Sequence, residues 1–365
     1  MAKTRNEVHN FNAGPAALPL EALEKAREEL VNFKGSGISL MEASHRSKLY
    51  EDVHNHAKEL FAELLSIPAG YEILFLQGGA SLQFAMLPMN FVTEGHPGAY
   101  VMTGSWADKA LSEAKKVGPT RVAGSTEAEK FHRTPSDSEI SIESTDAYVH
   151  VTSNETIGGV QWKDFPDAGS VPLVSDMSSD ILSRPIPVDR FSFIYAGAQK
   201  NLGPSGVTAV IAKSEFLQKA KTDVPTILSY ATHVKNNSLY NTPPTFGIYV
   251  LSLVLEWVKE NGGVAGMESL SRKKSSLIYD AIDESDGFFV GYVDKAYRSL
   301  MNVTFGLCTP ELEKKFLEEA KEIGFMGLNG HRSVGGCRAS IYNAVPLSAC
   351  ERLVEFMHDF ARRNK

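Results

Sequence analysis

Residues 195–206, Tyr-Ala-Gly-Ala-Gln-Lys-Asn-Leu-Gly-Pro-Ser-Gly, place a lysine where an apolar run gives way to glycine-rich turn residues. Phe191, Phe193 and Ile194 come just before and indicate a buried strand. The carboxyl ends of strands in α/β folds converge on the ligand crevice. A lysine withdrawn from water there has a lowered pKa and can attack a carbonyl as a neutral amine. Lys200 is therefore a candidate nucleophile, although most lysines are solvated surface groups.

Two further residues follow apolar runs at predicted strand ends. Asp176 comes after Val171-Pro-Leu-Val174, and Trp106 follows a run that turns at Gly104. An aspartate here could instead cap a turn, and a tryptophan could belong to the core. Together with a reactive lysine, however, a carboxylate for a pyridine nitrogen and a flat ring partner are what pyridoxal phosphate requires. We therefore expect that cofactor.

The cofactor phosphate needs backbone amides and hydroxyls, which a glycine-rich loop at a helix start supplies. Residues 73–84, Ile-Leu-Phe-Leu-Gln-Gly-Gly-Ala-Ser-Leu-Gln-Phe, have this strand, loop and helix pattern. We expect Ser81 to be the N-cap of the helix. The segment alone is weak evidence, and it gains weight from the other predicted cofactor contacts.

Eight blocks of sequence, in order along nearly the whole chain, carry a resemblance to a known family. The chain resembles the phosphoserine aminotransferases, which are class V, pyridoxal-phosphate-dependent enzymes of fold type I. This resemblance implies an α/β fold in which a large domain with a mostly parallel, seven-stranded type of sheet is followed by a smaller C-terminal α/β domain. The blocks are residues 10–15, 41–46, 104–106, 154–158, 175–179, 196–201, 239–244 and 330–340.

The resemblance also implies the roles of the cofactor residues. Lys200 would carry pyridoxal phosphate as a Schiff base and act as the catalytic base, with the catalytic Asp176 beside the pyridine nitrogen. Other members of the family have a Gly-Arg pair where this chain has Ala80-Ser81, so an arginine contact to the phosphate is in doubt here. The remaining implied contacts are ring stacking by Trp106, contacts from Thr156 and Gln199, and phosphate binding by Ala80, Ser81 and, from a second subunit, Asn241 and Thr242.

The substrate side requires cations, because phosphoserine and glutamate each carry an anion at both ends. The arginine fork matches carboxylate and phosphate geometry, although a single arginine is more often a surface ion-pair partner. The resemblance implies that Arg338 binds the α-carboxylate. It also implies that His331 and Arg332, with His45 and Arg46 of the neighbouring subunit, bind the distal anion. A homodimer with shared active sites follows.

Composition limits the remaining possibilities. The chain has 365 residues, 43% hydrophobic and 22% charged, which is ordinary for a globular protein. Its net charge of −7 argues against nucleic-acid binding. No stretch approaches the length of a membrane helix, and we predict no metal site and no membrane partner. A cytoplasmic location is expected, with an organellar mature form left open. The three cysteines suggest neither a metal site nor a disulfide set.

Apolar strands alternate with helical stretches along the chain, which predicts a mostly parallel sheet. We expect strands near 72–77, 99–103, 147–152, 171–175, 191–195 and 207–212, a helix from Leu20 to Phe33 and a long helix over 246–259. Asn261-Gly-Gly263 is a stop signal. We therefore predict a large domain over 18–262 and a small domain over 263–365, joined by an N-terminal arm, 1–17.

The predicted function is reversible transamination between glutamate and 3-phosphohydroxypyruvate, which yields phosphoserine and 2-oxoglutarate for serine biosynthesis. Use of 4-phosphohydroxythreonine, a substrate of pyridoxine biosynthesis, stays open. One alternative is another class V aminotransferase, of the alanine-glyoxylate or serine type, which would have no use for both His-Arg pairs. A second alternative is a binding protein that keeps the fold without the activity.

Overall fold

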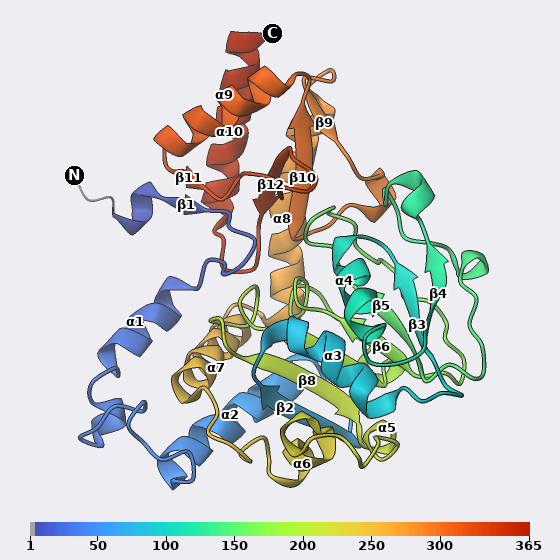
Figure 1. Ribbon diagram of the computed structural model, residues 1–365. Helices are drawn as coiled ribbons and strands as arrows, with labels where there is room; N and C mark the ends of the chain where they lie inside the picture. The colour runs from blue at the N-terminus through green and yellow to red at the C-terminus, as the bar shows by residue number, and fades with distance from the viewer. Residues whose placement is uncertain (1–3) are drawn as a thin grey trace.

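The computed structural model describes residues 4–365, which form two lobes (Figure 1). The larger lobe is built on a seven-stranded sheet with the order β2-β8-β7-β6-β5-β3-β4. Six strands of this sheet run in one direction, and β8 runs in the opposite direction, antiparallel to both β2 and β7. The strands are β2 (Tyr71–Leu76), β3 (Gly98–Met102), β4 (Thr120–Ser125), β5 (Tyr148–Thr152), β6 (Leu173–Asp176), β7 (Phe193–Gly197) and β8 (Thr208–Lys213).

Side chains of the central strands alternate between two cores on opposite faces of the sheet, as strand geometry requires. Ile194 of β7 belongs to the core that includes residues of α1, α2 and α7, whereas Phe193 and Tyr195 belong to the core of α3 and α4. Both faces are thus covered, which explains the continuous apolar runs of these strands. The helices of this lobe are α1 (Leu20–Glu28), α2 (Lys48–Leu64), α3 (Gly79–Phe91), α4 (Ser105–Ala114), α5 (Ser214–Leu217), α6 (Tyr230–Lys235) and α7 (Thr245–Glu260).

The smaller lobe has its own core around an antiparallel three-stranded sheet, β12-β10-β9. The N-terminal segment joins it, because β1 pairs with β11 in parallel and Phe11 lies in this core. Its elements are β1 (His9–Asn10), α8 (Gly263–Asp283), β9 (Phe289–Gly291), β10 (Asn302–Leu307), α9 (Pro310–Glu322), β11 (Phe325–Met326), β12 (Cys337–Ser340) and α10 (Leu347–Asn364).

Helix α8 connects the two lobes (Figure 1). It starts at Gly263, the last residue of the predicted stop signal, but its first turns pack in the large core through Val264 and Met267. Ile278 and Ile282, further along, lie in the small core. The division at residue 262 stays a prediction, because one helix contributes to both cores.

The predicted mostly parallel sheet is confirmed, and each of the six predicted strands overlaps an observed one. The seventh strand, β4, was missed because Thr-Arg-Val-Ala-Gly-Ser lacks an apolar run; it lies at the sheet edge, and Val122 is 49% exposed. The predicted helix from Leu20 to Phe33 was too long. Helix α1 ends at Glu28, and Phe33 enters the core from a separate 3₁₀ turn, 33–35.

Helix α7 supports the segment that follows β7. Leu251 is fully buried, and a Cβ on Gly203 would lie 3.2 Å from the Leu251 Cα. The glycine therefore permits a close approach of the loop to the helix.

We expect Leu251→Ala to lower the free energy of unfolding by about 2–5 kcal/mol, because it removes packed atoms and leaves a cavity. The matched control Val122→Ala, on the exposed sheet edge, should change it by about 0.5 kcal/mol or less. Denaturant unfolding of both variants measures the difference, and equal losses would contradict this account of the core.

Candidate active site

Three parallel strands bring their carboxyl ends to one edge of the large sheet. The register aligns Thr152 of β5 with Asp176 of β6, and Asp176 with Tyr195 of β7. Lys200 is the third residue after Gly197, the last residue of β7, and lies in the turn that follows the strand. The strand ends therefore lie at the edge where open α/β sheets bind ligands.

Lys200 is only 9% exposed, and its Nζ donates a hydrogen bond to Thr156 Oγ1 at 2.7 Å. The same Nζ lies 5.2 Å from the centroid of the Trp106 ring. Burial lowers the pKa of Lys200 to about 8, while the nearby Asp176 and Glu155 carboxylates oppose this effect. A neutral amine is thus accessible close to neutral pH, as a nucleophile or general base requires.

Asp176 is 5% exposed at the end of β6. Its Oδ1 accepts hydrogen bonds from the Ser178 amide at 2.9 Å and from Ser178 Oγ at 2.6 Å. Across residues 4–365, no donor bonds its Oδ2. Burial raises the pKa of Asp176, whereas Lys200 opposes that shift. This carboxylate is held on one side only, so its second oxygen is free for a cationic ring nitrogen.

Trp106 is the second residue of α4, and its buried Nε1 has no partner in the described chain. Sequence reasoning missed the residue that holds this helix end, Glu155. Its Oε2 accepts the Trp106 amide and its Oε1 accepts the Ala107 amide, both at 3.0 Å. The only sequence signal was its place in the block 154–158, beside Thr156.

Helix α3 starts at Gly79, one position after Gly78, which adopts a left-handed φ of 85°. Ser81 is therefore the third residue of the helix, and the predicted N-cap at Ser81 was wrong. Ala80 and Ser81 both lie in the first turn, where amides have no partner within the helix. A Cβ on Gly79 would meet no atom within 4 Å, so the space beside this glycine is open.

The other predicted cofactor residues lie in two places. Gln199 folds its side chain back over Gly197 at the end of β7. Asn241 and Thr242 contact Gln77 of the same chain: Asn241 Nδ2 donates to Gln77 Oε1, and Gln77 Nε2 donates to the Thr242 carbonyl, both at 3.3 Å. This loop therefore reaches the segment just before α3. Its contribution to a partner's site stays a prediction.

Arg338 of β12 extends from the small lobe to the same edge. Its Nη1 donates to the Thr156 carbonyl at 3.2 Å, and its buried Nε has no partner. No carboxylate within residues 4–365 forms an ion pair with it, so the guanidinium fork can receive one. Burial lowers the pKa of Arg338.

His331 lies near the same cations. Its pKa is lowered by burial and then by Arg338, Lys109 and Arg332. Lys109, which the sequence reasoning missed, belongs to α4 and holds its Nζ 4.0 Å from the Trp106 ring centroid. Arg332 is exposed, while His331 is half-buried and bonds Ser333 Oγ at 2.6 Å. These side chains make a cationic cluster beside the lysine.

Within the single chain, His45 and Arg46 are not brought to the cationic cluster beside Lys200. They lie in the turn before α2, and no hydrogen bond or ion pair within residues 4–365 links them to the other predicted site residues. Arg46 is exposed, and the buried His45 Nε2 has no partner. Their contribution to the site of a neighbouring subunit stays a prediction.

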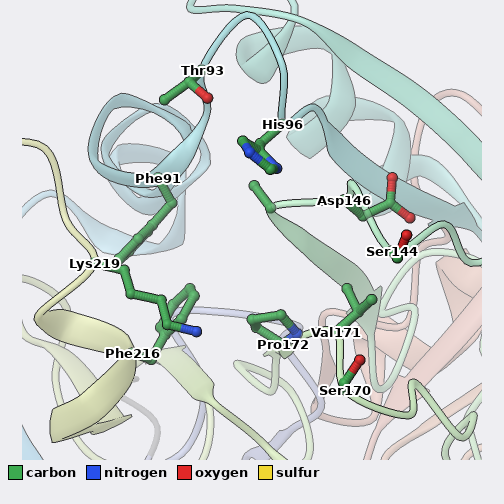
Figure 2. Close-up of a pocket in the computed structure, with 11 residues that line it drawn as sticks. Phe91, Thr93, His96, Ser144, Asp146, Ser170, Val171, Pro172, Phe216 and Lys219 are labelled. Carbon is green, nitrogen blue, oxygen red and sulfur yellow. The ribbon is translucent and has the colours of Figure 1, made fainter.

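A hollow of ≈ 340 Å³ lies elsewhere, lined by Phe91, His96 and Lys219 among others (Figure 2). Its wall includes Ala147 and Pro172, which come just before β5 and β6. It is therefore at the amino ends of these strands. It contains none of the predicted site residues.

Comparison with known proteins identifies the family. The profile of the aminotransferase class-V family matches residues 8–353. The chain therefore belongs to the class V aminotransferases. A curated phosphoserine aminotransferase of Geobacillus kaustophilus is 61% identical over 97% of this chain and 98% of its own length. The chain is thus a member of the phosphoserine aminotransferase family, as the resemblance implied.

Solved structures give the same result for the fold. Phosphoserine aminotransferase from Bacillus circulans subsp. alkalophilus superposes with a TM-score of 0.97 at 58% identity, covering 98% of this chain and 99% of that chain. A phosphoserine aminotransferase of Trichomonas vaginalis, described as bound to pyridoxal phosphate, has a TM-score of 0.91 at 39% identity, with 96% and 99% covered. The fold type I architecture is confirmed.

The residues present fit pyridoxal phosphate, on which the class V enzymes depend. The first-turn amides of α3 are donors that suit an anion, and the free Asp176 Oδ2 suits a protonated ring nitrogen. The unpartnered Trp106 Nε1 is the kind of buried polar atom that a ligand or water satisfies. Among residues 4–365, no group of histidine, cysteine and acidic side chains could hold a metal ion.

The lowered pKa of Lys200 predicts a pH-dependent cost to stability in the cofactor-free protein. An unfolded lysine titrates at 10.5 and the folded one at about 8, so below pH 8 its charged form costs roughly 3 kcal/mol. As pH rises from 8 to 10.5 that cost disappears, because the unfolded lysine loses its proton as well. We therefore expect the free energy of unfolding of Lys200→Met to exceed that of the wild type, and the difference to be largest at pH 7.

Denaturant unfolding of the cofactor-free proteins between pH 7 and 10.5 measures this difference. The exposed Lys219→Met is the matched control and should give a difference that does not change with pH. A constant difference for Lys200→Met would contradict the burial cost.

Proposed function

We propose that this chain catalyses reversible amino transfer between glutamate and 3-phosphohydroxypyruvate, with O-phospho-L-serine and 2-oxoglutarate as products. The observation that carries the proposal is that Lys200 and Arg338 both donate hydrogen bonds to the same residue, Thr156. Thr156 accepts the lysine amine through its hydroxyl and the arginine through its carbonyl. A substrate carboxylate on Arg338 would thus hold its α-carbon close to the lysine.

Bound pyridoxal phosphate supplies an aldehyde that links to amines and a ring that accepts the electrons of the broken Cα–H bond. Lys200, as the neutral amine that burial favours, would take the proton from the substrate α-carbon and deliver it to the carbon that the cofactor aldehyde supplies. Asp176 Oδ2 would keep the ring nitrogen protonated, and the Trp106 ring would provide a flat surface beside Lys200 Nζ.

The distal anion of either substrate would lie at the cationic cluster. His331 and Arg332 supply donors beside Arg338, and Lys109 adds a further charge from α4. His45 and Arg46 would join them from a partner subunit. The same cluster would accept the phosphate of phosphoserine or the side-chain carboxylate of glutamate, which explains how one pocket serves both substrates.

The decisive assay is the formation of phosphoserine from 3-phosphohydroxypyruvate and glutamate, with and without added pyridoxal phosphate. Preference for serine or alanine over phosphoserine would instead favour an alanine-glyoxylate or serine transaminase. Absence of any transamination under both conditions would refute the proposal that the chain is an aminotransferase.

Serine biosynthesis is the pathway that this activity would serve. A cytoplasmic location and the use of 4-phosphohydroxythreonine remain predictions; among residues 4–365, no helix is long and apolar enough to cross a membrane.

The two arginines should respond differently to substitution. Arg338→Ala is expected to lower kcat/KM for every amino donor by roughly 100-fold, because all donors share the α-carboxylate. Arg332→Ala should lower kcat/KM for phosphoserine by roughly 10-fold or more and leave alanine little changed. Steady-state rates with both donors measure this.

Arg352→Ala, at an exposed arginine of α10 that pairs with Glu355, is the control and should leave both rates unchanged. Equal losses for both donors in Arg332→Ala would remove this residue from the distal pocket.

Shared sites predict complementation between two inactive variants. If Arg46 acts in the partner's site, a mixed dimer of Arg46→Ala and Arg338→Ala contains one site with both native arginines. Random mixing should then restore about a quarter of wild-type activity, from one intact site in half of the dimers. Co-expression with two purification tags measures it. No recovery in isolated mixed dimers would place Arg46 outside the partner's site.

A further inference from the structure

Glu155 is a fully buried carboxylate to which the proposed chemistry gives no role. It lies in the turn between β5 and the segment 160–162, where its own amide donates to the Val160 carbonyl at 2.8 Å. Its side chain reaches α4, some fifty residues earlier in the chain, and accepts the amides of the second and third residues of that helix. These amides have no partner within the helix.

The approach of this carboxylate to α4 requires a glycine. A Cβ on Gly104, the residue before the helix, would lie 2.6 Å from the Glu155 Cδ, a distance that real atoms do not reach. The helix start is therefore shaped to receive the carboxylate, and both oxygens are used. A two-point contact fixes the rotation of the first turn as well as its position.

That first turn carries side chains of the active site. Trp106 lies within it, with its ring 5.2 Å from Lys200 Nζ. Lys109, one turn on, belongs to the cationic cluster around His331. On the other side, the next residue after Glu155 is Thr156, which accepts Lys200 and Arg338. The dipeptide Glu155-Thr156 thus contacts the helix turn that carries the Trp106 ring, and it also contacts Lys200 and Arg338.

We propose that Glu155 is a positioning residue, which fixes the Trp106 ring beside Lys200 by binding the first turn of α4 from the turn that also holds the lysine. This inference rests on the proposed role of Trp106 at the cofactor. Both oxygens matter, because each oxygen accepts a different amide. Burial raises the pKa of Glu155 to about 7, and the two amides oppose the shift.

Glu155→Gln tests the inference with almost no change of shape. The amide side chain keeps one acceptor and turns a donor toward the second backbone amide, so one contact is lost. We expect the near-ultraviolet circular dichroism of Trp106 in the cofactor-free protein, taken as the difference from Trp106→Phe, to fall. We also expect pyridoxal phosphate to bind roughly 10- to 100-fold more weakly. Glu155→Asp, which keeps the charge but is shorter, should show a loss of the same kind and carries the test if Glu155→Gln does not fold.

Thr309→Ala is the matched control. Thr309 caps α9 by accepting the Leu312 amide, and within residues 4–365 it forms no hydrogen bond with a predicted site residue. It should lower the melting temperature by a few degrees and leave both the Trp106 signal and cofactor binding unchanged. If Glu155→Gln lowers only the melting temperature, and cofactor binding stays within twofold of the wild type, the positioning role is refuted. If the wild type itself binds no pyridoxal phosphate, the proposed function fails instead.

Discussion

The parallel register of β5, β6 and β7 is the constraint on which the site depends. It aligns Thr152, Asp176 and Tyr195 across neighbouring strands, so the segments that follow leave the sheet at one edge. Apolar side chains on both faces fix this register, because a slip by one residue would exchange the two cores. The packing of the sheet therefore determines where the candidate catalytic residues Lys200 and Asp176 lie relative to each other.

Burial then changes the chemistry of the groups at that edge. Lys200, Asp176 and Glu155 are all withdrawn from water. Burial lowers the pKa of the lysine and raises the pKa of the two carboxyl groups, so it favours the neutral form of each. Their opposite charges limit these shifts. The result is a lysine that can exchange a proton near neutral pH, next to carboxylates that are held in place by backbone and hydroxyl donors.

Much of this could be predicted from the sequence, because strands buried on both faces appear as apolar runs and the polar residues after them meet at one edge. This argument predicted that Lys200, Asp176 and Trp106 lie at this edge, where the structure has them, and their roles in catalysis stay predictions. Residues whose role is set by a distant partner could not be found. Glu155 binds a helix whose start lies far away in sequence, and Lys109 looks like any exposed helical lysine. Strand β4 was missed because an edge strand needs no apolar run.

The turn 154–160 is bonded to both lobes. Gly159 lies where a Cβ would be 2.7 Å from Thr304 Oγ1, and Asn154 Nδ2 donates to Asn302 Oδ1 at 2.8 Å. The neighbouring Thr156 holds Lys200. A hinge motion that parts the lobes must therefore either carry this turn along or break its bonds. The position of the small lobe and the hydrogen bond that holds Lys200 therefore depend on one and the same turn.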